Sequence, residues 1–80
     1  MTIGAAVRNR ILELCNERNI TVNKLATTSG ITQSTLSNIV SGRNNSATVS
    51  TIQKLCDGFD ITIDKFFSHD MFRNIEPEVK

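Results

Sequence analysis

The chain contains few of the residues on which several classes of protein depend. Its 80 residues include no Trp or Tyr, four Phe, one Pro and two Cys. Two cysteines cannot form the disulfide framework of a small secreted domain. No apolar run approaches the roughly 20 residues of a membrane-spanning helix, and the N-terminus lacks the basic flank and apolar stretch of a signal peptide. The composition therefore predicts one small cytoplasmic domain with reduced cysteines.

The charges are unevenly distributed along the chain, although the net charge is only +1. Residues 1–55 contain six basic and two acidic residues, whereas residues 56–80 contain three basic and six acidic residues. This asymmetry indicates that the first part meets an anionic partner and that the second part does not.

The apolar residues recur at steps of three and four, which is the period of amphipathic helices. The pattern predicts five helices, the first from about Ala5 to Arg18 and the others after Thr21, Thr32, Thr48 and Thr62. Threonine is a good N-cap, and Asn or Gly in the left-handed conformation ends a helix, so we expect the first two helices to end at Asn19 and Gly30. The residues expected to face the core are Val7, Ile11, Leu14, Cys15, Leu25, Ala26, Leu36, Ile39, Val40, Val49, Ile52, Leu55, Cys56, Phe59, Ile63, Phe66 and Phe67.

The sequence between and after these helices is less regular. Residues 43–47 are polar and aperiodic, which predicts an exposed loop. Residues 68–80 form a short tail that is either docked on the domain or frayed. No β-hairpin signal occurs, so we predict an all-α fold.

Residues 21–42 have the properties of a helix-turn-helix. This motif needs a small residue where its two helices approach each other, here Ala26, and a glycine in the turn, here Gly30. The spacing resembles the Cro/C1-type (XRE) family of bacterial and phage regulators, which includes lambda-like repressors. The matching residues are Thr21, Leu25, Ala26, Ser29, Gly30, Ile31, Leu36, Ile39, Gly42 and Arg43, with Leu55 and the segment 60–67 further along.

The resemblance implies both a fold and a function. The fold is a compact five-helix DNA-binding domain over residues 1–67, with the helix-turn-helix at its second and third helices. The function is sequence-specific binding of double-stranded DNA by a homodimer, which acts as a repressor on an inverted-repeat operator. The chain departs from the family pattern at Ala47, where many members have Pro, and at Val22, where Gln is frequent and a side-chain phosphate contact is lost.

The third helix is expected to contact bases in the major groove. Its outward side chains are uncharged hydrogen-bonding groups, whereas a solvated helix favours Lys and Glu. Gln and Asn can donate and accept at once, which suits the N7 and N6 groups of adenine. We expect Gln33 to be the strongest base contact, followed by Ser34 and Asn38, with Thr35 contacting a base or a phosphate.

Phosphate contacts are expected from the start of the second helix and from the end of the third. A helix N-terminus presents unpaired backbone N–H groups that attract phosphate, and the family's backbone-contacting positions follow the third helix. The expected contacts are Thr21, Val22, Asn23, Ser41, Arg43 and Asn44, with Arg10 and Lys24 as additions.

The sequence favours neither a metal site nor catalysis. His69, Cys15 and Cys56 are scattered singly, without the close ligand pairs of metal sites, and both cysteines lie on apolar stripes. No base, nucleophile and orienting group accompany the single His. We therefore expect a protein that is not an enzyme, with no cofactor, no metal and no evident small-molecule ligand.

The sequence is also compatible with two other functions. The same fold serves antitoxins that bind a partner protein as well as DNA, and the acidic tail permits this function without favouring it. An RNA- or protein-binding adaptor is less consistent with the polar third helix. The dimer surface is expected at the fifth helix and tail, which are rich in apolar residues, although Phe66 and Phe67 could instead close the core. The tail residues concerned are Met71, Phe72 and Ile75.

Overall fold

A computed structural model describes residues 1–43 and 47–79 of the chain. Within this part the secondary structure is entirely helical, as the sequence predicted. The five α-helices are α1 (Ile3–Arg18), α2 (Val22–Ser29), α3 (Gln33–Val40), α4 (Val49–Phe59) and α5 (Ile63–Phe67), and they are followed by a short 3-10 helix, η1 (Asp70–Phe72).

Threonine side chains cap the N-termini of the first four helices. The hydroxyls of Thr21, Thr32 and Thr48 each accept a hydrogen bond from the backbone N–H three residues later, at 3.0, 3.1 and 3.0 Å. The N-caps predicted for α2, α3 and α4 are therefore confirmed. Thr2 caps α1 in the same way, at 3.2 Å, and for this reason α1 begins at Ile3, two residues before the predicted start.

Residues in the left-handed conformation end three of the helices. Asn19 and Gly30 have φ values of 57° and 71°, as predicted for the ends of α1 and α2. The residue that ends α4 is Asp60, with φ of 58°. Gly58 lies inside α4, where it allows close approach to α2: a Cβ at this position would lie 2.1 Å from Ser29 Oγ.

Asp60→Gly is expected to raise the free energy of unfolding by about 0.5–1 kcal/mol. Glycine adopts the left-handed conformation without a Cβ clash, and the change also removes a negative charge from the C-terminus of α4. Asp60→Asn is the matched control, because it removes the charge but keeps a Cβ. Urea unfolding of the three proteins separates the two contributions, and a lower midpoint for Asp60→Gly than for wild type would contradict the backbone argument.

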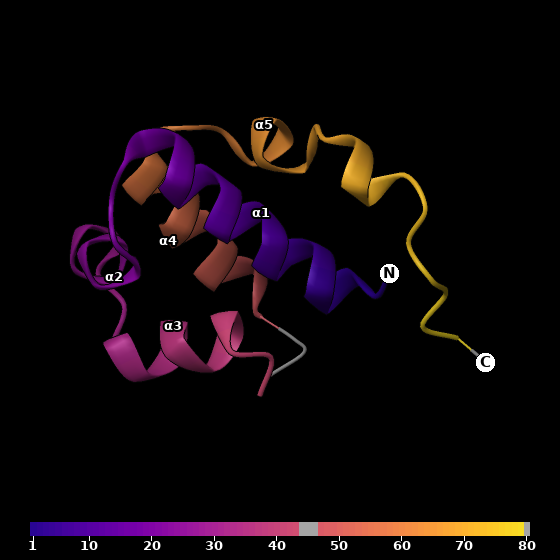
Figure 1. The fold of residues 1–80 in the computed structure, drawn as a ribbon, viewed down its shortest axis with the longest axis horizontal. Helices are drawn as coiled ribbons and strands as arrows, with labels where there is room; N and C mark the ends of the chain where they lie inside the picture. The colour runs from indigo at the N-terminus through magenta and orange to yellow at the C-terminus, as the bar shows by residue number, and fades with distance from the viewer. Residues whose placement is uncertain (44–46, 80) are drawn as a thin grey trace.

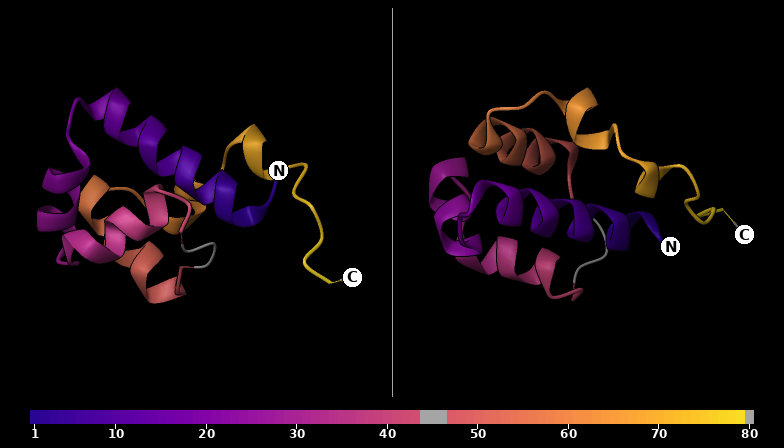
Figure 2. Two further views of the ribbon diagram at one scale, coloured as in Figure 1. Left: turned by 60° about the horizontal axis from the view of Figure 1, so that its bottom comes forward. Right: turned by 45° about the horizontal axis from the view of Figure 1, so that its top comes forward.

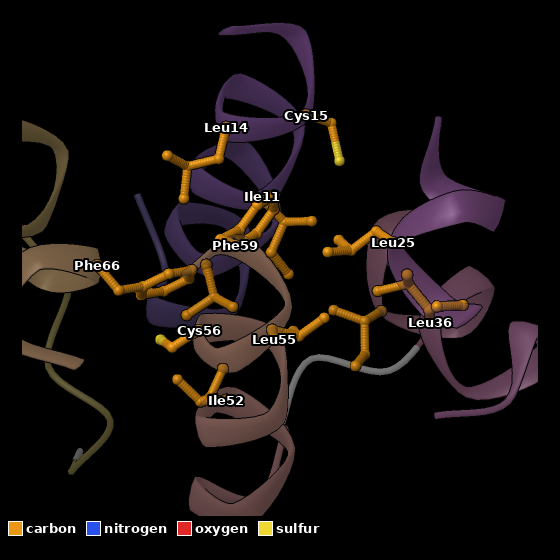
Figure 3. Packing of buried hydrophobic residues seen from close by; sticks show 13 residues of the cluster. Ile11, Leu14, Cys15, Leu25, Leu36, Ile52, Leu55, Cys56, Phe59 and Phe66 are labelled. Atoms are coloured by element: carbon orange, nitrogen blue, oxygen red, sulfur yellow. The ribbon is translucent and has the colours of Figure 1, made fainter. Parts of the chain in front are cut away.

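The core is shared by all five helices (Figure 3). Helix α1 packs on α3, and α2 packs mainly on α4. The fully buried large side chains are Ile11, Leu25, Leu36, Leu55, Cys56, Phe59 and Phe66. One predicted core residue is wrong: Val49 is 78% exposed, because it is the first residue of α4 and projects beyond the packed stripe.

The segment after α5 is docked on the domain. Phe72 of η1 joins Phe66 and Phe67 in an aromatic cluster, with ring centroids 6.2 and 4.9 Å from theirs. Further along, the backbone N–H of Glu76 donates to the carbonyl of Met1 at 3.0 Å. In Figure 1 and in the right view of Figure 2, α3 lies along one edge of the molecule, and α5 and η1 lie along the opposite edge.

Two arginines of α1 donate hydrogen bonds to backbone carbonyls at the C-terminal ends of other helices. Arg10 Nε donates to the carbonyl of Phe66 at 2.7 Å, and its Nη2 donates to the carbonyl of Lys65 at 3.1 Å. Arg18 donates to the carbonyl of Phe59, the last residue of α4, and its guanidinium lies 5.7 Å from the centroid of that residue's ring. Carbonyls at a helix end have no partner within the helix, so these arginines replace water as donors to α4 and α5.

Candidate nucleic-acid interface

Helices α2 and α3 are joined by a three-residue turn, Gly30–Thr32. Gly30 donates its N–H to the carbonyl of Thr27 at 3.3 Å, and Ile31 donates to the carbonyl of Ala26 at 3.1 Å. The next residue, Thr32, caps α3. The turn therefore provides hydrogen-bond donors for the last carbonyls of α2 and the N-cap of α3. These bonds fix how α3 is oriented relative to α2.

Helix α3 separates a buried apolar face from an exposed polar face. Leu36 and Ile39 are buried. The predicted base-contacting residues Gln33, Ser34 and Thr35 are exposed in its first turn. The other residue of this set, Asn38, lies one turn later and is half-buried.

One of these side chains already has a local hydrogen bond. The hydroxyl of Thr35 accepts a hydrogen bond from the hydroxyl of Thr32 at 2.8 Å. A hydroxyl has one proton to donate in addition to its acceptor sites, so Thr35 keeps a donor for a ligand atom. Its orientation is fixed by the N-cap of the helix on which it lies.

The N-terminus of α2 lies at the end of that helix opposite to the turn. The hydroxyl of Thr21 accepts the N–H of Lys24, which leaves the first backbone N–H groups, those of Val22 and Asn23, without a partner in the helix. The Val22 side chain packs partly against the core, so only the backbone N–H of this residue is available for a phosphate contact. The Lys24 side chain is exposed.

The end of α3 supplies the remaining predicted phosphate contacts. Ser41 and Arg43 are exposed, and the hydroxyl of Ser41 donates to the carbonyl of Asn38 at 3.3 Å. Gly42 between them has a left-handed backbone, with φ of 82°. Asn44 lies outside the described residues.

Arg10 is not available for the phosphate contact predicted for it. It is only 8% exposed, and its guanidinium is engaged with two carbonyls of α5 and, at 2.6 Å, with Glu13. Glu13 is about one turn further along α1, so this ion pair lies within one helix. Withdrawing Arg10 from these partners would leave several buried polar groups unsatisfied.

The structure instead places Arg8 beside the end of α3. An ideal Cβ on Gly42 would lie 2.7 Å from Arg8 Nη1, so the guanidinium lies directly over this glycine. Periodicity in the sequence shows only that Arg8 is a basic residue off the apolar stripe of α1. Its proximity to Gly42 depends on how α1 packs against α3.

Among residues 1–43 and 47–79, no group of three His, Cys, Asp or Glu side chains could hold a metal ion. Cys15 and Cys56 are buried, and burial raises the pKa of both thiols, which keeps them protonated. No helix in the described part is long and apolar enough to span a membrane.

A largely apolar hollow of about 270 Å³ lies away from the exposed face of α3. It is bordered by α1, α3, α4 and α5, and Glu78 is the charged residue of its described lining. Small-ligand sites combine apolar walls with several converging polar groups. This hollow has the apolar walls without such a set.

Comparison with known proteins assigns the family. A family model of the Cro/C1-type HTH DNA-binding domain matches residues 10–70. The crystal structure of the prophage Lp1 protein 11 is similar to this chain, with a TM-score of 0.82 and 32% sequence identity over 94% of this chain and 99% of that one. A search of curated proteins found no match. Residues 10–70 include every element from most of α1 to the first residue of η1, so the chain belongs to the Cro/C1-type helix-turn-helix DNA-binding domains, and it is a DNA-binding transcription regulator.

Proposed function

We propose that the protein is a repressor that binds an inverted-repeat operator as a homodimer, with α3 in the major groove. The observation that supports this most directly is the exposed first turn of α3, where Gln33, Ser34 and Thr35 present uncharged donors and acceptors. The major groove distinguishes base pairs by such groups. The opposite face of α3 is fixed in the core, so these side chains are held on a rigid element.

In the proposed complex, one group of residues contacts bases and another contacts the DNA phosphates. Gln33 makes a bidentate contact with adenine, Ser34 and Asn38 add further base contacts, and Thr35 contacts a base or a phosphate. The contacts with the phosphates of the DNA backbone come from Thr21, Val22, Asn23, Lys24, Ser41, Arg43 and Asn44. Phosphate contacts fix the register of α3 in the groove but do not distinguish sequences, so Gln33 and its neighbours determine specificity.

A dimer follows from the small size of one binding surface. One subunit presents a single helix to the groove, and two-fold dimers of helix-turn-helix proteins bind half-sites about 34–36 Å apart. The aromatic cluster of Phe66, Phe67 and Phe72 is packed within the subunit. Met71 and Ile75, which are half-buried, are the tail residues left to contribute to a dimer surface.

Selection of binding sites from random duplex DNA tests the specificity and the symmetry together. We expect an inverted repeat whose half-site centres lie about one helical turn apart, and sedimentation of the complex should give two chains per duplex. A single half-site occupied by one chain would contradict the dimer. A reporter with the selected site overlapping its promoter should be repressed, and a rise in expression would contradict the sign of regulation.

A further inference from the structure

The three arginines of α1 lie beside the ends of three different helices. Arg10 is engaged with carbonyls of α5, and Arg18 with the last carbonyl of α4. Arg8 lies at the end of α3, the helix proposed to enter the major groove. Within residues 1–43 and 47–79, no hydrogen bond or ion pair of the Arg8 guanidinium is found, in contrast to those of the other two arginines.

Gly42 makes room for the Arg8 side chain. A Cβ at this position would lie 2.7 Å from Arg8 Nη1, closer than non-bonded atoms can approach, so any other residue would displace the guanidinium. The Arg8 side chain is half-buried, which restricts its conformations before any ligand binds. A preordered arginine loses less entropy on forming a contact than a freely moving one.

The residues on either side of Gly42 are proposed phosphate contacts. Ser41 and Arg43 flank Gly42 in the chain, and both are exposed. The planar guanidinium can form two parallel hydrogen bonds with phosphate oxygens. We propose that Arg8 is a further DNA-backbone contact, which binds the phosphate next to the one contacted by Ser41 and Arg43 at the end of α3. This inference rests on the proposed placement of α3 in the major groove.

The salt dependence of DNA binding tests the inference. Each neutralised phosphate contributes about −0.9 to the slope of log K against log salt concentration. Arg8→Gln should therefore make the slope shallower by about 1 for each bound subunit, which is about 2 for the dimer on its operator. It should weaken binding to a selected-site duplex and to a random-sequence duplex by similar factors. Arg73→Gln is the matched control: it removes the same charge from an arginine that is 79% exposed on the opposite edge of the molecule.

The possible results separate this inference from the proposed function. If the wild-type protein shows no sequence preference, or if Gln33→Ala keeps it unchanged, the proposed function is wrong. If the wild-type protein prefers the selected sequence and Gln33→Ala relaxes this preference, the proposed function stands. If Arg8→Gln then shows the same salt dependence of DNA binding as Arg73→Gln, only the assignment of Arg8 is wrong. A loss of affinity with an unchanged slope and a lower unfolding midpoint would show that Arg8 merely supports the Gly42 turn, and this also overturns the assignment.

Discussion

Arg10→Met is expected to lower the free energy of unfolding by about 2–4 kcal/mol, between the loss of one hydrogen bond to a charged group and the loss of a fully buried ion pair. Methionine fills a similar volume but donates nothing. The carbonyls of Lys65 and Phe66 would lose their donor, and Glu13 would lose its cationic partner. A domain of this size is stabilised by roughly 4–12 kcal/mol in total, so urea unfolding followed by circular dichroism should show a large shift of the midpoint.

Arg73→Met is the control for this substitution. Arg73 forms an exposed ion pair with Asp70 at 3.2 Å, and such pairs contribute little, so its removal should change stability by less than about 0.5 kcal/mol. An equal loss in the two variants would show that the contacts of Arg10 with α5 do not stabilise the fold. Arg10→Met should also loosen η1, because His69 Nε2 lies 3.2 Å from the Glu13 carboxylate that Arg10 orients.

Gln33→Ala is expected to reduce affinity by about 5- to 150-fold for each half-site of the selected operator, because one bidentate base contact worth about 1–3 kcal/mol is lost in each subunit. Because the lost contact distinguishes bases, the preference at one position of each half-site should relax, whereas binding to random DNA should change little. Fluorescence anisotropy titrations with operator variants at that position measure both effects at a fixed salt concentration.

Gln53→Ala provides the matched comparison for Gln33→Ala. Gln53 is an exposed glutamine on α4, where its amide donates to Asp57 Oδ1 at 2.8 Å. Its removal should leave the operator preference intact. If the two variants bind every operator variant equally well, Gln33 does not contact a base.

The helices and their ends could be predicted because they depend on local sequence. The hydroxyls of Thr21, Thr32 and Thr48 bond to groups three residues away, and the left-handed Asn19 and Gly30 need no distant partner. The errors arose at the edges of the periodic pattern. Val49 belongs to the apolar stripe of α4 by spacing, but whether the first turn of that helix is covered depends on the packing of neighbouring helices.

In the candidate site, the exposed polar face of α3 could be predicted from the sequence, whereas the positions of the arginine side chains could not. The exposure of Gln33, Ser34 and Thr35 follows from the period of α3 alone. Arg10 and Arg8 are both off the apolar stripe of α1, so the sequence does not distinguish them. Arg10 is buried by partners 55 and 56 residues away, and Arg8 lies beside Gly42 because of the way in which α1 packs against α3.

The contacts of α1 with the ends of α4 and α5 have a consequence for synthesis on the ribosome. Arg10 and Arg18 of α1 emerge early, but the backbone carbonyls that accept their hydrogen bonds are 41 to 56 residues further along the chain. The contacts of Arg10 and Arg18 therefore form only after α4 and α5 have left the exit tunnel, whereas α2 and α3, which also pack on α1, emerge earlier. We therefore expect the nascent chain to complete its native structure in a late step, when α5 leaves the exit tunnel and Arg10 reaches the carbonyls of Lys65 and Phe66.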